Sequence, residues 1–216
     1  MLAAAAKADL TVGFTDSEFP EGYVRAAGLG YAPSMMIRHD RTGCGDWLVM
    51  TTMELARTLH DQLMRKGAAL GAIEIGVRAW DSLRLERGTP VIGLDVDRTL
   101  SPAEAGLSHL VAADKGDFFG RDAMLKRRNE FRLVRLVVQS GDNDPYINDL
   151  VTRDGRAVGL VRSGGHAHLA GGGVAFAALP AELAADGAAF EVEIFGQRYP
   201  AKISAARSTN GALAAN

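Results

Sequence analysis

Two tryptophans and one cysteine are the residues of this sequence best suited to ligand chemistry. Trp47 and Trp80 stand close to charged residues, such as Arg78 two positions before Trp80, so each ring could offer a flat face to a planar heterocycle. Cys44 lies in a turn and could act as a nucleophile only with a base beside it, for which His39 is the nearest candidate. The alternatives are that both tryptophans anchor an aromatic-poor core and that Cys44 is a bystander thiol.

Metal and nucleotide motifs are weak in this chain. His166 and His168 stand two residues apart, so on a strand both would face one side and could share a metal ion. No third ligand lies at a telling spacing, which favours a pair of polar loop histidines. Residues 28–30 lack the third glycine and the preceding strand of a dinucleotide fingerprint and are interpreted as a turn. Residues 142–145 lack the glycine and closing glutamate of a calcium loop and are interpreted as a polar turn.

The composition excludes several classes of function. The 216 residues include 24 Lys and Arg against 26 Asp and Glu, for a net charge of -2 without a basic stripe, so we expect no nucleic-acid partner. A single cysteine excludes an intramolecular disulfide framework and a cysteine-based zinc cluster. Residues 1–10 lack a long apolar core, so we expect no signal peptide, no membrane partner and, most simply, a cytoplasmic location.

In the first part of the chain, mixed strands and helices position the candidate residues. Residues 34–39 and 46–50 are predicted as short strands, and Cys44 lies in the glycine-containing turn at 41–45 between them. A helix is predicted from Thr51 or Thr52 to Gly67, because leucines at 55, 59 and 63 fall on one face. A second helix, from residue 74 or 76 to about residue 86, would carry Arg78 and Trp80.

From residue 131 onward the pattern is nearly all strand. The predicted strands are residues 132–138, 149–152, 157–161, 174–179, 190–194 and 199–203. Hairpin turns are predicted at Asp154-Gly155 and at residues 195–197. Six short strands with glycine-rich connections indicate a small antiparallel barrel or sandwich, so the predicted fold class is α+β.

Four segments are similar, in order, to motifs of the glycine-cleavage T-protein (aminomethyltransferase) superfamily. Residues 76–88 resemble G-x-R-A-x-D-S-L-R-L-E-x-G, and residues 93–107 resemble G-x-D-x-D…P-x-E-A-G-L. Residues 117–125 resemble D-F-I-G-R-E-A-L. Residues 163–177 resemble S-G-G-Y-G-H…G…L-A-L of the terminal barrel, in a version most like the folate domains of dimethylglycine and sarcosine dehydrogenases. Residues 38–50 extend the match where the family has R-x-S-Y-T-G-E-x-G-W-E-L.

The resemblance implies a fold, a cofactor and a reaction. The fold would be a partial α/β folate-binding domain over residues 1–125, followed by a small antiparallel β-barrel over 131–206. The cofactor would be tetrahydrofolate, which accepts a one-carbon unit. In the family, an aspartate in the first third of a full-length member helps to position or activate the attacking folate amine, and this chain begins after that region, so no catalytic residue is assigned.

The cofactor-binding residues that the resemblance implies are Cys44, Trp47, Arg78 and Trp80. The family's folate-contacting glutamate falls on Cys44, and the arginine of the T-proteins' Ala-Arg-Asp falls on Trp80, whereas Arg78 is retained as in the dehydrogenase-like branch. Replacing that glutamate by cysteine removes two charge-assisted hydrogen bonds to a pterin edge, a loss on the order of several kcal/mol at most. The pocket therefore takes a different ligand, or its folate binding is degenerate.

The leading hypothesis is tetrahydrofolate-dependent one-carbon transfer of the aminomethyltransferase or demethylase kind, with a small methylated donor. The chain would be the folate-binding half and would work with a partner chain or as a homo-oligomer. An absent amino-terminal part would leave some of the sheet unpaired, which predicts an exposed strand edge or apolar face. The alternatives are a non-catalytic structural or regulatory subunit and a module that binds another planar ligand. The sequence leaves open whether the chain is an enzyme by itself.

Overall fold

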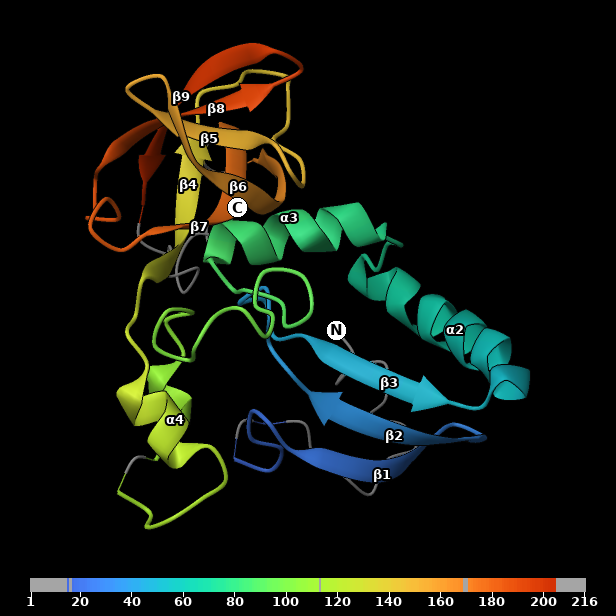
Figure 1. Ribbon diagram of the computed structural model, residues 1–216. Helices are drawn as coiled ribbons and strands as arrows, with labels where there is room; N and C mark the ends of the chain where they lie inside the picture. Colours follow the sequence, from blue (N-terminus) through green and yellow to red (C-terminus); the bar gives the residue numbers. More distant parts are fainter. Residues whose placement is uncertain (1–14, 16, 113, 169–170, 205–216) are drawn as a thin grey trace. The chain divides into compact units, whose positions relative to one another are not determined.

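The computed structural model describes residues 15, 17–112, 114–168 and 171–204 (Figure 1). The chain divides into two compact units at Trp80. The first unit ends at Trp80, and the second runs from Asp81 to Ser208. The division falls inside one helix, α3. The domain bounds predicted from the sequence, 1–125 and 131–206, stay a prediction. Residues 1–10, for which we expected no leader or membrane span, lie outside the described residues.

The first unit is built on a three-stranded antiparallel sheet in the order β1-β2-β3. The strands are β1 (Val24–Leu29), β2 (Ala32–Arg38) and β3 (Trp47–Thr51). The two predicted strands are confirmed as β2 and β3 to within two residues. The first strand, β1, was missed, because Gly28 and Leu29 belong to it and only Gly30, with φ +61°, forms the predicted turn.

Helix α2 (Met53–Gly67) covers one face of this sheet and is followed by the short 3-10 helix η1 (Ala68–Leu70). The helix was predicted over nearly these residues, with Thr52 at its N-cap. Apolar side chains at its leucine positions meet the sheet, as the helical period requires. The core between them is formed by Phe19, Leu29, Ala32, Met36 and Leu59.

Helix α3 (Val77–Arg87) also follows the prediction. It ends where Gly88 adopts φ +85°, a left-handed conformation that glycine accepts without steric cost. The 3-10 helix η2 (Ser108–Leu110) and the short helix α4 (Arg121–Lys126) lie in the segment that leads to the terminal strands. No helix among the described residues is long and apolar enough to cross a membrane.

The remaining strands close into a six-stranded antiparallel barrel, in the order β4-β7-β6-β5-β8-β9. The strands are β4 (Phe131–Val138), β5 (Leu150–Arg153), β6 (Arg156–Ala167), β7 (Gly172–Pro180), β8 (Ala189–Ile194) and β9 (Gln197–Ile203). All six predicted strands are present, and the choice between barrel and sandwich is resolved as a barrel. The α+β fold class with a small antiparallel barrel is therefore confirmed.

Local sequence explains how the barrel closes. The hairpins at Asp154-Gly155 and Phe195-Gly196 have positive φ at both central residues, 51° and 74° in the first and 50° and 77° in the second, as two-residue hairpins with native twist require. Gly159 allows β6 to approach its neighbour closely, since a Cβ there would lie 2.7 Å from the Ala178 carbonyl oxygen. The interior is filled by aliphatic side chains, mainly valine, leucine, isoleucine and alanine.

Candidate functional site

The loop between β2 and β3 is held by two aspartates that bind its own backbone. Asp40 Oδ1 accepts hydrogen bonds from the backbone N–H groups of Gly43 at 2.8 Å and Gly45 at 3.1 Å. Asp46 accepts one from the backbone N–H of Thr42 at 2.9 Å and one from the Thr42 hydroxyl at 2.6 Å. These bonds satisfy the polar backbone of a tight loop and fix its shape, so the two carboxylates serve the fold.

Cys44 lies exposed at the tip of this loop, between two glycines with φ +82°. Its backbone N–H donates to Thr42 Oγ1 at 3.3 Å. The base that a nucleophilic role requires is engaged elsewhere, because His39 Nδ1 lies 3.5 Å from Glu21 Oε1. Among the described hydrogen bonds, none joins His39 to Cys44. The geometry therefore favours an exposed thiol without a base beside it over a catalytic nucleophile.

Trp47 begins β3 and lies half-buried against the core of the first unit. Its ring meets the Phe19 ring edge-on, with centroids 4.7 Å apart and an interplanar angle of 76°. The Arg38 guanidinium lies 5.7 Å from the ring centroid, within the range of a cation–π contact. Of the two readings given by the sequence, this geometry corresponds to the core anchor.

Arg78 and Trp80 lie in the first turns of α3, where Arg78 is exposed and Trp80 is half-buried. The Arg41 guanidinium lies 5.8 Å from the Trp80 ring centroid. Both residues belong to the first unit. Because Arg41 belongs to the same loop as Cys44, the structure brings the loop and Trp80 together. The contact of Arg41 with Trp80 thus joins the loop of Cys44 to the helix of Arg78 and Trp80. Trp47 packs apart from them, against Phe19 in the core of the first unit.

A buried ion pair in the second unit joins Arg84 of α3 to Asp95 in the segment that follows the helix. The guanidinium of Arg84 is fully buried, with Nη1 2.6 Å from Asp95 Oδ2 and Nε 2.6 Å from Asp81 Oδ1. Nη2 donates to Ser163 Oγ at 2.9 Å, and the group lies 5.8 Å from the centroid of the Phe176 ring. The Ser163 hydroxyl in turn donates to Asp95. A buried charge persists only when it is paired and hydrogen-bonded in this way.

Glu104 forms a second buried centre where the chain enters the barrel. Its carboxylate accepts hydrogen bonds from the backbone N–H groups of Ser101 at 2.7 Å, Glu130 at 2.9 Å and Phe131 at 3.1 Å, and lies 3.0 Å from Arg127 Nη2. Burial of the carboxyl raises its pKa, but the hydrogen bonds from Ser101, Phe131 and Glu130 outweigh burial and lower the pKa to about 2. The carboxylate is therefore ionised at neutral pH. Its hydrogen bonds hold Ser101 and Glu130 beside Phe131, the first residue of β4.

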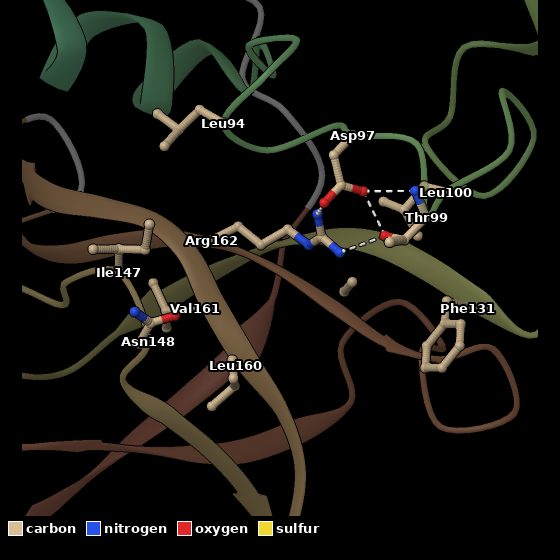
Figure 2. Close-up of a pocket in the computed structure, with 11 residues that line it drawn as sticks. Leu94, Asp97, Thr99, Leu100, Phe131, Ile147, Asn148, Leu160, Val161 and Arg162 are labelled. Carbon is tan, nitrogen blue, oxygen red and sulfur yellow. Dashed lines mark hydrogen bonds and ion pairs between the residues drawn. The ribbon is translucent and has the colours of Figure 1, made fainter.

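A pocket of about 480 Å³ opens on the second unit, beside β6 and the segment before residue 100 (Figure 2). Its polar wall is the Arg162 guanidinium, which lies 3.1 Å from Asp97 Oδ2 and donates to Thr99 Oγ1 at 3.1 Å. Hydrogen bonds from Thr99 lower the pKa of the Asp97 carboxyl. The apolar walls are Leu94, Phe131, Ile147, Leu160 and Val161. This arrangement can hold a small, largely apolar molecule, and none of the four predicted site residues lines it.

The histidine pair also lies in the second unit. His166 and His168 approach edge-on with ring centroids 4.8 Å apart, and His166 Nδ1 lies 3.3 Å from Asp144 Oδ1. Over the described residues, no group of three or more His, Cys, Asp or Glu side chains is arranged to hold a metal ion. The pair is accordingly a polar contact between β6 and the turn at 142–145.

Two models of known protein families match this chain. The family model of the GCVT N-terminal domain matches residues 2–115, which is more than half of the chain. The chain belongs to the GCVT family. The model of the glycine cleavage T-protein C-terminal barrel domain matches residues 132–207, the segment that contains the six-stranded barrel.

Relatives of this GCVT-family chain are enzymes of greater length. An aminomethyltransferase of Nostoc is 36% identical over 190 residues, which is 84% of this chain and 48% of that protein. Human mitochondrial dimethylglycine dehydrogenase is 34% identical over 179 residues, 79% of this chain and 20% of that protein. The 4-methylaminobutanoate oxidase (formaldehyde-forming) of Paenarthrobacter nicotinovorans is 34% identical over 181 residues, 81% of this chain and 21% of that protein. The chain thus spans about half of the first relative and a fifth of the others.

A solved structure supports the fold of the GCVT-family chain. The glycine cleavage system aminomethyltransferase T from Bartonella henselae matches with a TM-score of 0.69 at 24% identity, over 80% of this chain and 48% of that one. At this identity the match concerns the fold.

The GCVT motifs turn out to contain the structural centres that we did not predict. Arg84 and Asp95 come from the first two motifs, Ser163 from the fourth, and Glu104 from the second. The signal was present in the sequence, because charged residues stand among the apolar positions of otherwise buried segments.

Proposed function

We propose that this chain supplies the folate-binding part of a protein that carries out tetrahydrofolate-dependent one-carbon transfer, of the aminomethyltransferase or demethylase kind, together with a partner. The observation that carries the proposal is the contact of Arg41 with Trp80 in the first unit, at 5.8 Å. It joins the loop of Cys44 to the helix of Arg78 and Trp80. These are the segments to which the family resemblance assigns the folate contacts.

The relatives support the reaction class. Their names denote an aminomethyltransferase, a dimethylglycine dehydrogenase and a methylaminobutanoate oxidase that forms formaldehyde, which act on aminomethyl or N-methyl groups. We extend that class to this chain, with a small methylated amine as the donor.

The residues present fit part of a folate. Trp80 offers a half-buried ring for stacking, and the exposed guanidinium of Arg78 can pair with a carboxylate of the folate tail. When bound, tetrahydrofolate supplies the amine that accepts the one-carbon unit. Productive transfer requires this amine to be oriented beside the donor and an electrostatic partner for the developing cation.

The acidic part of the site has to come from outside the β2–β3 loop. Cys44 stands where the family has glutamate, and the carboxylates of Asp40 and Asp46 accept hydrogen bonds from the loop itself. In this proposal the chain binds and orients the folate, and the partner contributes the carboxylate.

Calorimetric titration with tetrahydrofolate tests the proposal, on the chain alone and with any co-purifying chain. We expect Trp80→Ala to weaken binding by about two- to tenfold, because an aromatic stack contributes about 0.5–1.5 kcal/mol. Cys44→Glu should strengthen binding by restoring the carboxylate. Tyr31→Ala is the matched control, since Tyr31 is 90% exposed in the same unit and should not matter. Absence of binding in both preparations would remove the proposal.

The exposed thiol at position 44 favours a second candidate function. A non-catalytic structural or regulatory subunit would keep the fold and its buried ion pairs while the folate contacts are lost. This candidate predicts a stable hetero-complex whose activity survives both Cys44→Ala and Trp80→Ala. The two candidates thus differ in the effect of the same substitutions.

A further inference from the structure

The pocket of about 480 Å³ on the second unit contains an arginine with one side open (Figure 2). Arg162 Nη1 lies 3.1 Å from Asp97 Oδ2, and Nη2 donates to Thr99 Oγ1 at 3.1 Å. Nη1 also donates to the Asp95 carbonyl oxygen at 3.3 Å. Among the described residues, Nε of this arginine has no hydrogen-bond partner, and Figure 2 draws dashed lines only at the other two nitrogens. The Nε–H is therefore available to a ligand.

Arg84, in the same unit, shows what such a guanidinium binds when all three nitrogens are used. Its Nη1 binds the carboxylate of Asp95 and its Nε binds that of Asp81, both at 2.6 Å. Arg162 has a carboxylate at Nη1, from Asp97, and among the described residues it has none at Nε. A carboxylate is the partner that the planar N–H fork of arginine matches in geometry. The chemistry of the open side therefore favours a carboxylate.

A β-bulge in β6 places this arginine in the pocket wall. The register with β7 passes from Val161 opposite Ala177 directly to Ser163 opposite Phe176, so Arg162 is the extra residue of the bulge. Bulges bend a strand, re-aim a side chain and occur often beside functional sites. The irregularity coincides with the one charged residue of β6 that lines the pocket.

The loop before β5 forms a fixed wall of the same pocket. The backbone N–H of Asn148 donates to the Val161 carbonyl oxygen at 2.8 Å, and the backbone N–H of Val161 donates to the Asp149 carbonyl oxygen at 2.9 Å. Asn148 has φ +72°, a left-handed conformation that few residues other than glycine adopt. These bonds hold Ile147 and Asn148 beside β6, so this part of the pocket is formed by the fold itself.

Large apolar side chains surround the arginine. Leu94, Phe131, Ile147 and Leu160 line the pocket and are 39%, 42%, 44% and 46% exposed. A contiguous exposed apolar patch is typical of a surface that binds another molecule. The volume lies within the range of small-molecule pockets, roughly 300–1,000 Å³, in which apolar walls surround a few polar groups. The walls therefore fit the apolar body of a small ligand.

We propose that this pocket binds a small monocarboxylic acid with an aliphatic or aromatic body. The carboxylate accepts hydrogen bonds from the Nε side of the Arg162 guanidinium, and the body packs against Leu94, Phe131, Ile147 and Leu160. The Asp97 carboxylate, 3.1 Å from the same guanidinium, repels a second negative charge and so disfavours a phosphate ester. The inference goes beyond the proposed function, because it uses only residues of the second unit and does not require folate.

NMR titration of the isotope-labelled chain with phenylacetate tests the proposal. The Nε–H signal of Arg162, assigned by its loss in Arg162→Lys, should shift in a saturable way at millimolar acid. Backbone signals of residues 147–148 and 160–162 should shift with it. Phenylacetamide lacks the charge and acetate lacks the apolar body, so each should bind about tenfold more weakly or worse.

Substitutions in the pocket and outside it locate the site. Arg162→Gln should abolish saturable binding. Leu160→Asn removes apolar wall and Ala178→Leu fills the pocket, and each should weaken binding by about fivefold or more while the arginine stays in place. Arg198→Gln on β9 and Leu125→Asn on α4 are the matched controls, since both residues lie outside the pocket and should not matter. The backbone amide spectrum of each variant establishes that its fold is retained.

Three outcomes would overturn the proposal. One is no saturable shift of the Arg162 Nε–H signal. Another is phenylacetamide binding as tightly as phenylacetate, or binding that neither Leu160→Asn nor Ala178→Leu weakens. The third concerns a short peptide that ends in leucine, which carries the same carboxylate and an apolar group. Tighter binding of this peptide than of phenylacetate would assign the pocket to a chain terminus.

Discussion

The barrel and the three-stranded sheet differ in what they do with strand edges and with charge. Each barrel strand is hydrogen-bonded on both sides, and its apolar side chains fill a closed interior. Three charged groups packed around it, Arg84, Asp95 and Glu104, are buried and paired, Arg84 with Asp95 and Glu104 with the partly exposed Arg127. The sheet of the first unit ends in two edges, buries one face and leaves an apolar face exposed.

This difference shows that the second unit encloses its own apolar core, whereas the described part of the first unit leaves one apolar face of its sheet exposed. Closure removes the edges that would recruit other strands, and paired charges satisfy one another inside the protein. In the described part of the first unit, the apolar face of the sheet stays exposed. Substitutions in the two regions should therefore differ in their cost to stability. Four substitutions test this difference, in order of decreasing expected effect: Arg84→Met, Glu104→Gln, Asp46→Ala and Met35→Gln.

Arg84→Met should have the largest effect. It leaves the carboxylate of Asp95 buried without the positive charge of Arg84, and breaking a buried ion pair in this way typically costs about 3–5 kcal/mol. Urea denaturation followed by circular dichroism measures the change. Arg128→Met, at an exposed arginine, should stay within about 0.5 kcal/mol. Adding Asp95→Asn to Arg84→Met should restore part of the loss, and strictly additive costs would contradict the pairing.

Glu104 should make stability fall in acid. The folded pKa of about 2 lies below the ordinary value of 4.5, so ionised Glu104 contributes stability above pH 4.5 that is lost as the pH falls toward 2. The shift corresponds to about 3 kcal/mol. Denaturation measured from pH 6 to pH 2 should show a steeper decline in the wild type than in Glu104→Gln, whose stability is low throughout. Glu182→Gln, at an exposed glutamate, should follow the wild-type curve.

Asp46→Ala should have an intermediate effect, in the first unit. It removes the acceptor for the Thr42 hydroxyl and for two backbone N–H groups of the β2–β3 loop, which should cost about 2 kcal/mol. Trp47 and Trp80 both lie in this unit, so tryptophan fluorescence reports the transition. Asp46→Asn keeps one carbonyl acceptor and should recover about half of the loss. Equal losses in both variants would mean that the hydrogen bonds are not the cause.

Met35→Gln should have the smallest effect and is the sharpest test of the open face. Met35 and Met36 are neighbours on opposite faces of β2, 46% exposed and fully buried. Met36→Gln should cost about 1–3 kcal/mol because it buries an amide in an apolar core, whereas Met35→Gln should stay within about 0.5 kcal/mol in the chain alone. A large cost for Met35→Gln, measured by the same denaturation, would mean that this face of the sheet is already covered.

Local patterns in the sequence were enough to predict most of the elements. Alternation over residues 132–203, glycine-containing hairpin turns and the apolar period of α2 act over a few residues. The six barrel strands, β2, β3 and two helices could therefore be placed. The strand β1 was missed because Gly28 and Gly30 obscured its alternation, whereas in the structure its register with β2 is continuous from Val24 to Leu29.

The site was predictable only in part. Family resemblance pointed to Cys44, Trp47, Arg78 and Trp80, and the structure brings the loop of Cys44 to Trp80 through Arg41. The sequence could not show that Asp40 and Asp46 bind their own loop or that His39 faces Glu21 instead of Cys44. These assignments depend on side-chain directions within a tight turn, which residue type and spacing leave open.

By itself, the sequence determined the kinds of elements, the GCVT motifs and the absence of an intramolecular disulfide, because each depends on residues close together in the chain or on composition. Only the tertiary structure decided that the motif residues Arg84, Asp95 and Ser163 form one buried centre, since 68 positions separate Asp95 from Ser163. It also decided which face of the sheet lacks a cover. A burial pattern with period two gives two faces, and only packing tells which of them meets the core.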